Sequence, residues 1–95
     1  MKEKIIANIL ILNLIVIGGM TYPRITTTGD CDDYALASYN YLEWMGYSPV
    51  IKLGDSHVWV ETDWFRYDNG VFNLSLREGT IITLETLLEY VEKDK

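Results

Sequence analysis

Residues 26–46 read TTTGDCDDYALASYNYLEWMG and contain the single cysteine of the chain, Cys31. Asp30 precedes it at the position where the N-cap of a helix belongs. Small and apolar residues then recur at helical spacing as far as Gly46, a residue suited to the position just after a helix. The pattern predicts a helix over residues 31–45, with these side chains on one side: Cys31, Ala35, Ser38, Leu42 and Met45.

Beyond this helix the hydrophobic pattern changes to the alternation that is typical of strands. Short strands are predicted at residues 48–53, 56–61, 64–68 and 71–73, and Asn69-Gly70 is a strong signal for a tight hairpin between the last two. Residues 83–94 have the amphipathic pattern of a C-terminal helix. Together these elements predict an α+β fold in which a helix packs on a small antiparallel sheet.

The composition narrows the possible functions. A chain of 95 residues, 48% of them hydrophobic, can form one small domain. Its 14 acidic and 8 basic residues give a net charge of -6, which argues against nucleic acid or an anionic membrane surface as the main partner. A single cysteine cannot form an internal disulfide, and no Cys/His set has the spacing of metal ligands. We expect neither a metal nor a cofactor.

The first 20 residues, MKEKIIANILILNLIVIGGM, place two lysines before an apolar run. The run is shorter than the about 20 residues that a spanning helix needs, so its length favours a signal peptide. The small-residue cleavage pattern at Gly18-Gly19 is weak, which leaves an uncleaved N-terminal membrane anchor as the alternative. A buried helix or strand of the domain is a third interpretation. Either membrane interpretation of residues 1–20 makes the protein extracytoplasmic, secreted or anchored to the membrane.

Residues 21–29, TYPRITTTG, have no helical period and are interpreted as a linker at the start of a domain that spans residues 21–95.

Cys31 lies where unpaired backbone N–H groups and the helix dipole favour a thiolate nucleophile. The single histidine, His57, is the candidate base. If Thr62 and Asp63 form the loop of the following hairpin, His57 faces Asp68, and residues opposed in this way lie about 5 Å apart on one side of the sheet. An aspartate at that position can orient the imidazole ring. A one-residue bulge would instead turn Asp68 to the other face, as an ordinary turn residue.

The same alternation separates two faces of the hairpin. The core face is predicted to hold Val58, Val60, Phe65 and Tyr67. The other face is predicted to hold His57, Asp68, Trp59, Glu61, Trp64 and Arg66.

Three segments resemble the transglutaminase-like cysteine peptidase superfamily, including its small bacterial and archaeal members. They are GDCDDYA (residues 29–35), HVWVE (residues 57–61) and WFRYD (residues 64–68), in the order of the family pattern G-D-C-x-D-Y-A, H-a-W-v-E and W-y-x-x-D. The resemblance covers roughly residues 27–73 and implies a papain-like core. It also implies that Cys31 is the nucleophile, His57 the general base and then acid, and Asp68 the orienting acid of a catalytic triad. The chain is small for this family, with little sequence left for substrate-binding walls.

The residues around Cys31 bear on the pKa of its thiol and on which groups could stabilise an oxyanion. Asp30, Asp32 and Asp33 are close to it in sequence, and bare carboxylates would raise its pKa. We expect Asp30 and Asp33 to act as helix caps instead. The Cys31 backbone N–H is the natural oxyanion donor, and Tyr22 is a candidate second donor with a packing role as its alternative.

We expect structural roles for two tryptophans and one arginine near the motifs. Trp59 and Trp64 are expected to cover the site or fill the space between helix and sheet. Arg66 is expected to pair with Glu61 diagonally across the hairpin rather than to bind substrate.

The resemblance implies a thiol-dependent amide-bond enzyme, a peptidase, amidase or acyl transferase that acts through a thioester on Cys31. The expected substrate is an extracytoplasmic peptide or protein amide, with cell-wall peptide as one candidate. Two alternatives remain open. One is a non-catalytic, membrane-tethered binding or assembly module of the same fold, and the other is an unrelated small membrane protein in which the cysteine is merely packed.

Overall fold

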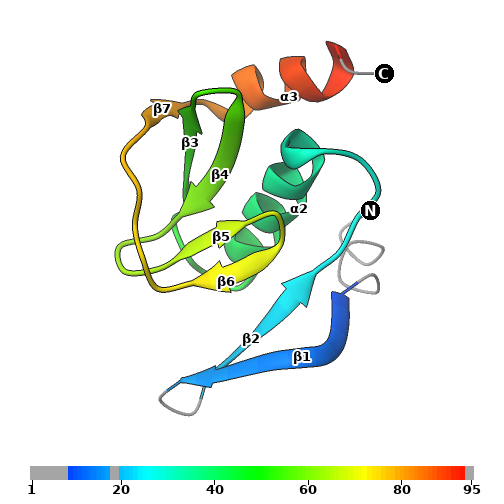
Figure 1. Cartoon of the computed structure of the whole chain (residues 1–95), viewed down its shortest axis with the longest axis vertical. Coiled ribbons are helices and arrows are strands. Elements are labelled where there is room, and N and C mark those ends of the chain that lie inside the picture. The colour runs from blue at the N-terminus through cyan, green and yellow to red at the C-terminus, as the bar shows by residue number, and fades with distance from the viewer. Residues whose placement is uncertain (1–8, 18–19, 94–95) are drawn as a thin grey trace.

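The computed structural model of the protein describes residues 9–17 and 20–93. In chain order the elements of these residues are β1 (Ile9–Ile17), β2 (Met20–Ile25), α2 (Cys31–Trp44), β3 (Val50–Gly54), β4 (His57–Glu61), β5 (Arg66–Asp68), β6 (Val71–Asn73), β7 (Thr80–Ile82) and α3 (Leu84–Lys93). Five strands form an antiparallel sheet in the order β6-β5-β4-β3-β7, and β1 and β2 form a separate two-stranded sheet (Figure 1). The predicted α+β class is confirmed.

The start of α2 is fixed by the acidic residues around Cys31. Asp30 Oδ1 accepts the backbone N–H of Asp32 at 3.1 Å, and Asp33 Oδ2 accepts the backbone N–H of Asp30 at 3.2 Å. This capping box satisfies amides that the helix itself leaves unpaired. The helix ends at Trp44, and Gly46 follows with φ of +96°, in the left-handed region.

Small side chains let α2 pack closely on one face of the five-stranded sheet. The buried residues of α2 are Ala35, Ser38, Tyr41 and Leu42. They meet the core face of the hairpin, where all four predicted side chains are buried: Val58, Val60, Phe65 and Tyr67. Met45, predicted on this side of the helix, is exposed because α2 ends before it.

The strands β4 and β5 pair two residues away from the predicted register. The observed pairs are Val60 with Tyr67 and Glu61 with Arg66. The loop between them has four residues, and the Thr62 backbone N–H closes it by donating to the Phe65 carbonyl at 2.9 Å. The prediction that His57 lies directly opposite Asp68 is therefore wrong. A shift of two residues leaves the side chains within the two strands on their predicted faces, because strand side chains alternate with a period of two. Trp64 lies in the loop and instead packs on the core residues Tyr22 and Phe72.

The interpretation of residues 21–29 as a linker is wrong for its first half, because β2 reaches as far as Ile25. The Ile25 backbone N–H donates to the Gly70 carbonyl at 2.8 Å, and the Tyr67 hydroxyl donates to the Pro23 carbonyl at 3.0 Å. Tyr22 and Ile25 are buried in the main hydrophobic core. The strand β2 is thus part of the domain.

Residues 9–17 form β1, which pairs antiparallel with β2. The predicted signal peptide or anchor extends over residues 1–8 and 18–19, which lie outside the described residues, and it stays a prediction. Within residues 9–17 and 20–93, no helix has the length and apolar character needed to cross a membrane.

The connection between β6 and β7, residues 74–79, crosses the sheet on the face opposite α2, and we call it the strap (Figure 1). Arg66 Nε donates to the Ser75 carbonyl at 2.9 Å. Glu61 Oε2 accepts the Arg77 backbone N–H at 2.8 Å, and Lys52 Nζ donates to the Arg77 carbonyl at 3.0 Å. These bonds hold the strap on the polar face of the sheet.

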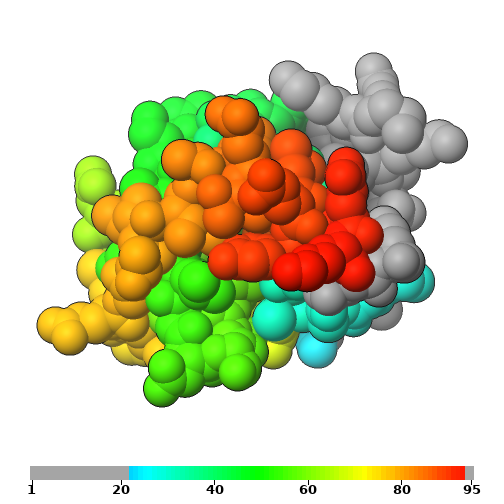
Figure 2. Space-filling model, turned by 90° about the horizontal axis from the view of Figure 1, so that it is seen from above, coloured from blue at the N-terminus to red at the C-terminus, as the bar shows by residue number. Residues whose placement is uncertain are grey.

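The predicted C-terminal helix is confirmed as α3. Thr83 Oγ1 accepts the backbone N–H of Thr86 at 3.1 Å and so caps the helix start. Leu87 and Val91 are buried, whereas Leu88, at the edge of the apolar face, is exposed. Figure 2, seen from above, shows α3 on the face turned toward the viewer, beside the strap and the green residues of the β3–β4 hairpin.

Candidate active site

His57 and Asp68 meet on the polar face of the sheet. His57 is the first residue of β4, Asp68 is the last of β5, and His57 Nε2 lies 2.5 Å from Asp68 Oδ1. The second carboxylate oxygen of Asp68, Oδ2, accepts a hydrogen bond from Arg66 Nη1 at 2.7 Å, and Arg77 Nη1 lies 3.7 Å from it. A carboxylate held on one side by arginine can fix the orientation of an imidazole on the other.

The imidazole ring is also fixed by packing. The ring of Trp59 lies almost parallel to that of His57, with 5.8 Å between the centroids and 26° between the planes. The guanidinium of Arg77 lies 4.7 Å from the centroid of the Trp59 ring on the strap side. Within the described part of the chain, His57 Nδ1 makes no hydrogen bond, so this nitrogen is the one left for a proton transfer.

Cys31 lies beside the strand that carries His57. It is the first residue of α2 and is half-buried. The backbone amide of Val58, the residue after His57, lies close enough to the sulfur to stabilise its thiolate. Cys31 Sγ donates to Asp32 Oδ1 at 3.8 Å, and among the described residues no hydrogen bond joins it to the His57 ring.

The electrostatic surroundings of the thiol differ from the expectation. Burial raises the pKa of the Cys31 thiol above its ordinary value, the carboxylates of Asp32 and Asp30 raise this pKa further, and the Val58 amide acts in the opposite direction. Asp30 and Asp33 are caps, as predicted. Asp32 is the carboxylate that faces the sulfur, so the environment favours the neutral thiol.

The backbone at the start of α2 offers one amide to a ligand. Asp30 oxygens accept the N–H groups of the next three helix positions, Asp32, Asp33 and Tyr34. The Cys31 N–H has no acceptor within the described residues. An unpaired amide beside a nucleophile is suited to stabilising an oxyanion.

Tyr22 has the packing role that was the alternative to oxyanion donor. Its ring stacks on Phe72 with 4.3 Å between the centroids, and its hydroxyl lies 3.4 Å from that of Tyr47. Burial and the Tyr47 hydroxyl raise the pKa of Tyr22 to about 12. Its side chain is part of the aromatic core.

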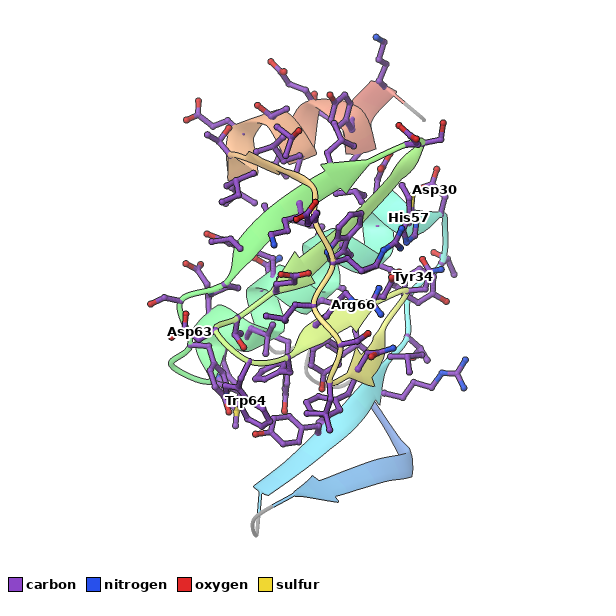
Figure 3. All side chains as sticks on the ribbon, turned by 60° about the vertical axis from the view of Figure 1, so that its left-hand side comes forward. Asp30, Tyr34, His57, Asp63, Trp64 and Arg66 are labelled. Carbon is purple, nitrogen blue, oxygen red and sulfur yellow. The ribbon has the colours of Figure 1, made fainter. Side chains whose placement is uncertain are left out.

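Trp64 lies away from the proposed site (Figure 3) and does not cover it, which was one of its two expected roles. Its ring packs edge to face with Tyr22 at a centroid distance of 5.7 Å, and the side chain is 42% exposed. Figure 3 shows Trp64 and Asp63 on the opposite side of the molecule from Asp30 and His57.

Arg66 and Glu61 lie opposite each other in the strand register, but the Arg66 side chain binds Asp68 and the strap, so the predicted side-chain pairing of Arg66 with Glu61 is wrong. Glu61 is buried and binds Lys52 Nζ at 2.7 Å and Trp59 Nε1 at 2.9 Å instead. The bond between Arg66 and Asp68 was not predicted, although a signal existed: the two residues are two apart in one strand and therefore share a face.

Comparisons with protein-family models, with curated proteins and with solved structures return no match for this chain. The resemblance to the transglutaminase-like superfamily therefore stays a prediction from the three sequence motifs. Over the residues that the structure describes, no group of three or more His, Cys, Asp or Glu side chains could hold a metal ion.

Proposed function

We propose that this protein is a thiol-dependent amide-bond enzyme of the transglutaminase-like kind. In this proposal Cys31 is the nucleophile, His57 the general base and then acid, and Asp68 the residue that orients His57. The observation that carries the proposal is the 2.5 Å contact between His57 and Asp68 on a strand whose next residue, Val58, lies against the Cys31 sulfur. The single cysteine, the single histidine and a carboxylate held by arginine all lie near one end of a helix. Core packing alone gives no reason for this arrangement.

The proposed reaction begins when the Cys31 thiol transfers its proton to His57 and the sulfur attacks the carbonyl carbon of an amide. The Cys31 backbone N–H stabilises the oxyanion. The imidazolium then protonates the leaving nitrogen as the carbon–nitrogen bond breaks, which leaves a thioester on the sulfur. Water or a second amine attacks the thioester and loses its proton to the imidazole, and the thiolate leaves and is reprotonated.

The substrate class follows from the expected location of the domain. An export signal or anchor in residues 1–20 would bring it outside the cytoplasm, so we propose a peptide or protein amide there, including cell-wall peptide. Hydrolysis and acyl transfer share the first half of the reaction.

A second candidate is a non-catalytic, membrane-tethered binding or assembly module of the same fold. The raised pKa of the Cys31 thiol favours it, since burial and Asp32 hold the sulfur in its unreactive neutral form.

Alkylation by iodoacetamide separates the two candidates. The rate constant for Cys31 is measured between pH 5 and pH 9 in the native protein and in His57→Ala, with folding checked by circular dichroism. An enzyme is expected to lose reactivity near neutral pH by at least about 10-fold in His57→Ala, because the Cys31 thiol loses the group that accepts its proton. Asp63→Asn, on the opposite side of the molecule, is the matched control and keeps the native rate.

A thiol that reacts at the same rate in the native protein and in His57→Ala contradicts the enzyme and favours the module. Loss of folding in Cys31→Ser would point to a cysteine that is merely packed.

A further inference from the structure

A cavity of about 310 Å³ lies at the end of α2 that is remote from Cys31. It is lined by Gly46, Tyr47, Ser48, Thr62, Asp63 and Trp64, which come from the segment after α2 and from the loop between β4 and β5. A helix of 14 residues is about 21 Å long at 1.5 Å per residue, so the cavity is separated from the thiol by about the length of α2. Its volume is in the range of pockets that hold small ligands.

The electrostatic field at this cavity favours a cation. No basic residue lies in the last turn of α2, so no side chain there compensates the negative end of the helix dipole. Asp63 adds a full negative charge, and its carboxylate makes no hydrogen bond or ion pair within the described residues. The described basic residues all lie outside the lining: Arg24, Lys52, Arg66, Arg77 and Lys93.

The lining also supplies aromatic surface. Trp64 and Tyr47 are among the lining residues, and the Trp64 side chain is 42% exposed although its ring also packs edge to face on Phe65. Aromatic rings attract cations through their quadrupole, most strongly in the case of tryptophan. An anion would be repelled by Asp63, and a neutral ligand would gain only the aromatic contact.

We propose that this cavity binds the ammonium group of an alkylamine, with the Asp63 carboxylate accepting an ammonium N–H and Trp64 packing against the charge and its methylene chain. The ammonium comes either from a lysine side chain of a peptide or from a free primary amine. The site does not depend on the chemistry proposed for Cys31.

Chemical shift changes in 15N-labelled protein test the proposal. The full chain is titrated at low salt with n-butylammonium and with Nα-acetyl-lysine methylamide, and in parallel with the neutral analogues n-butanol and Nα-acetyl-norleucine methylamide. We expect saturable shifts of the Trp64 indole N–H and of amides in residues 46–48 and 62–64, with affinity at least about 10-fold higher for the cations. Tighter binding of the lysine derivative supports a peptide lysine as the source, and equal binding supports recognition of the ammonium alone.

Two matched variants locate the site. Asp63→Asn is expected to weaken binding by about 10-fold, because it removes the charge that pairs with the ammonium. Asp55→Asn removes an equal charge from the exposed turn between β3 and β4 and is expected to keep the native affinity. Cys31→Ser is also expected to keep the native affinity for the ammonium ligands. This result would show that the cavity binds them independently of the chemistry proposed for Cys31.

Absence of saturable shifts overturns the proposal. Equal affinity for the neutral analogues, or equal weakening by Asp55→Asn and Asp63→Asn, does so as well.

Discussion

Asp68 shows how much of the site a single residue can reveal before the structure is known. The alternation of the hairpin predicted that Asp68 and His57 share a face, and their contact confirms it. The same alternation placed Arg66 on this face but did not predict that Arg66 holds the other oxygen of the carboxylate. Alternation assigns faces, and it does not assign partners among the several polar side chains on one face.

The thiol was predicted less well than the histidine. Sequence places Cys31 at a helix start, where the dipole favours the thiolate, but burial and the orientation of Asp32 decide the direction of its pKa. Both are tertiary features that a motif does not contain.

Asp32→Asn tests this balance. Burial is the main cause of the raised pKa of Cys31, and the Asp32 carboxylate is the largest charge contribution in the same direction. Removing that charge lowers the pKa, so a larger fraction of the thiol is ionised at pH 7 and alkylation accelerates by about 3-fold or more. The rate of Cys31 alkylation by iodoacetamide measures this change, with Asp63→Asn as the control. Slower alkylation in Asp32→Asn would contradict the conclusion that the Asp32 carboxylate raises the pKa of Cys31.

Ser38→Ala is expected to stabilise the protein. The Ser38 hydroxyl is buried in the α2 interface and has no hydrogen-bond partner in the described part of the chain. Removing an unsatisfied hydroxyl and introducing the better helix former raises the free energy of unfolding by about 1 kcal/mol. Urea denaturation measures the change, and the exposed Ser48→Ala should leave stability nearly unchanged. A less stable Ser38→Ala would show that the hydroxyl has a partner.

At the scale of elements, the strongly patterned segments were predicted and the weakly patterned ones were not. The helices α2 and α3 and the strands β3 to β6 all occur near their predicted positions. The strand β2 contains Pro23 and Arg24 without alternation, and β7, with the sequence Thr-Ile-Ile, does not alternate between polar and apolar residues either. Such strands form because a neighbouring edge accepts them, which is a property of the assembled sheet.

Gly70→Ala tests the turn between β5 and β6, which also contacts the end of β2 through the Ile25 backbone. Asn69 and Gly70 have φ of 50° and 81°, as a two-residue hairpin turn requires, and a Cβ on Gly70 would lie only 1.9 Å from the Ile25 carbonyl oxygen. We expect a loss of about 2 kcal/mol or more from backbone strain plus collision. Gly46→Ala is the control, since Gly46 also has positive φ but a Cβ added there would have nothing within 4 Å. Equal losses in the free energy of unfolding in the two variants would show that a collision with the Ile25 carbonyl does not contribute.

Glu61 links the strap to the acid stability of the protein. Burial opposes its charge, but the Lys52 ammonium, the Arg77 backbone N–H and the Trp59 indole outweigh it and lower the pKa of Glu61 below its ordinary value of 4.5. Because the folded pKa is the lower one, this stabilisation is complete above about pH 4.5 and is lost as the pH falls through the folded value.

Glu61→Gln is therefore expected to lower the free energy of unfolding by about 3 kcal/mol at pH 7, since Lys52 then lacks its counter-charge. The difference from the native protein shrinks as the pH falls below about 4.5, as denaturation curves at each pH would show. The exposed Glu43→Gln is the control, and a difference that stays constant with pH contradicts the role of the charge.

At the scale of the whole molecule, residues 9–17 are open to two roles, as a strand of the fold or as part of a targeting segment. They form β1, and they are also the apolar part of the predicted signal peptide or anchor. The strand β2 pairs with them, and it is also held from the other side, because Tyr22 and Ile25 are buried in the main core.

A chain that begins at Met20 should therefore fold with a free energy of unfolding within about 1 kcal/mol of the full chain, because the core that it keeps is intact. Thermal and urea unfolding of the two chains measure the difference. Failure of the shorter chain to fold would assign β1 to the domain and would favour the third interpretation of the N-terminal residues.

The cavity at the end of α2 had no counterpart in the sequence analysis. Its walls come from residues 46–48 and 62–64, two short segments without a motif. Only the packing of α2 on β4 brings them together, so no local pattern could indicate a pocket there.

The three tryptophans lie in three different surroundings. Trp59 is buried against His57, Trp64 lines the cavity, and Trp44 is exposed in the last turn of α2. Indole fluorescence shifts to longer wavelengths with solvent contact, and a protonated imidazole nearby quenches it. Variants that retain a single indole would thus report optically on the histidine, on the cavity or on the helix end, each without an added dye.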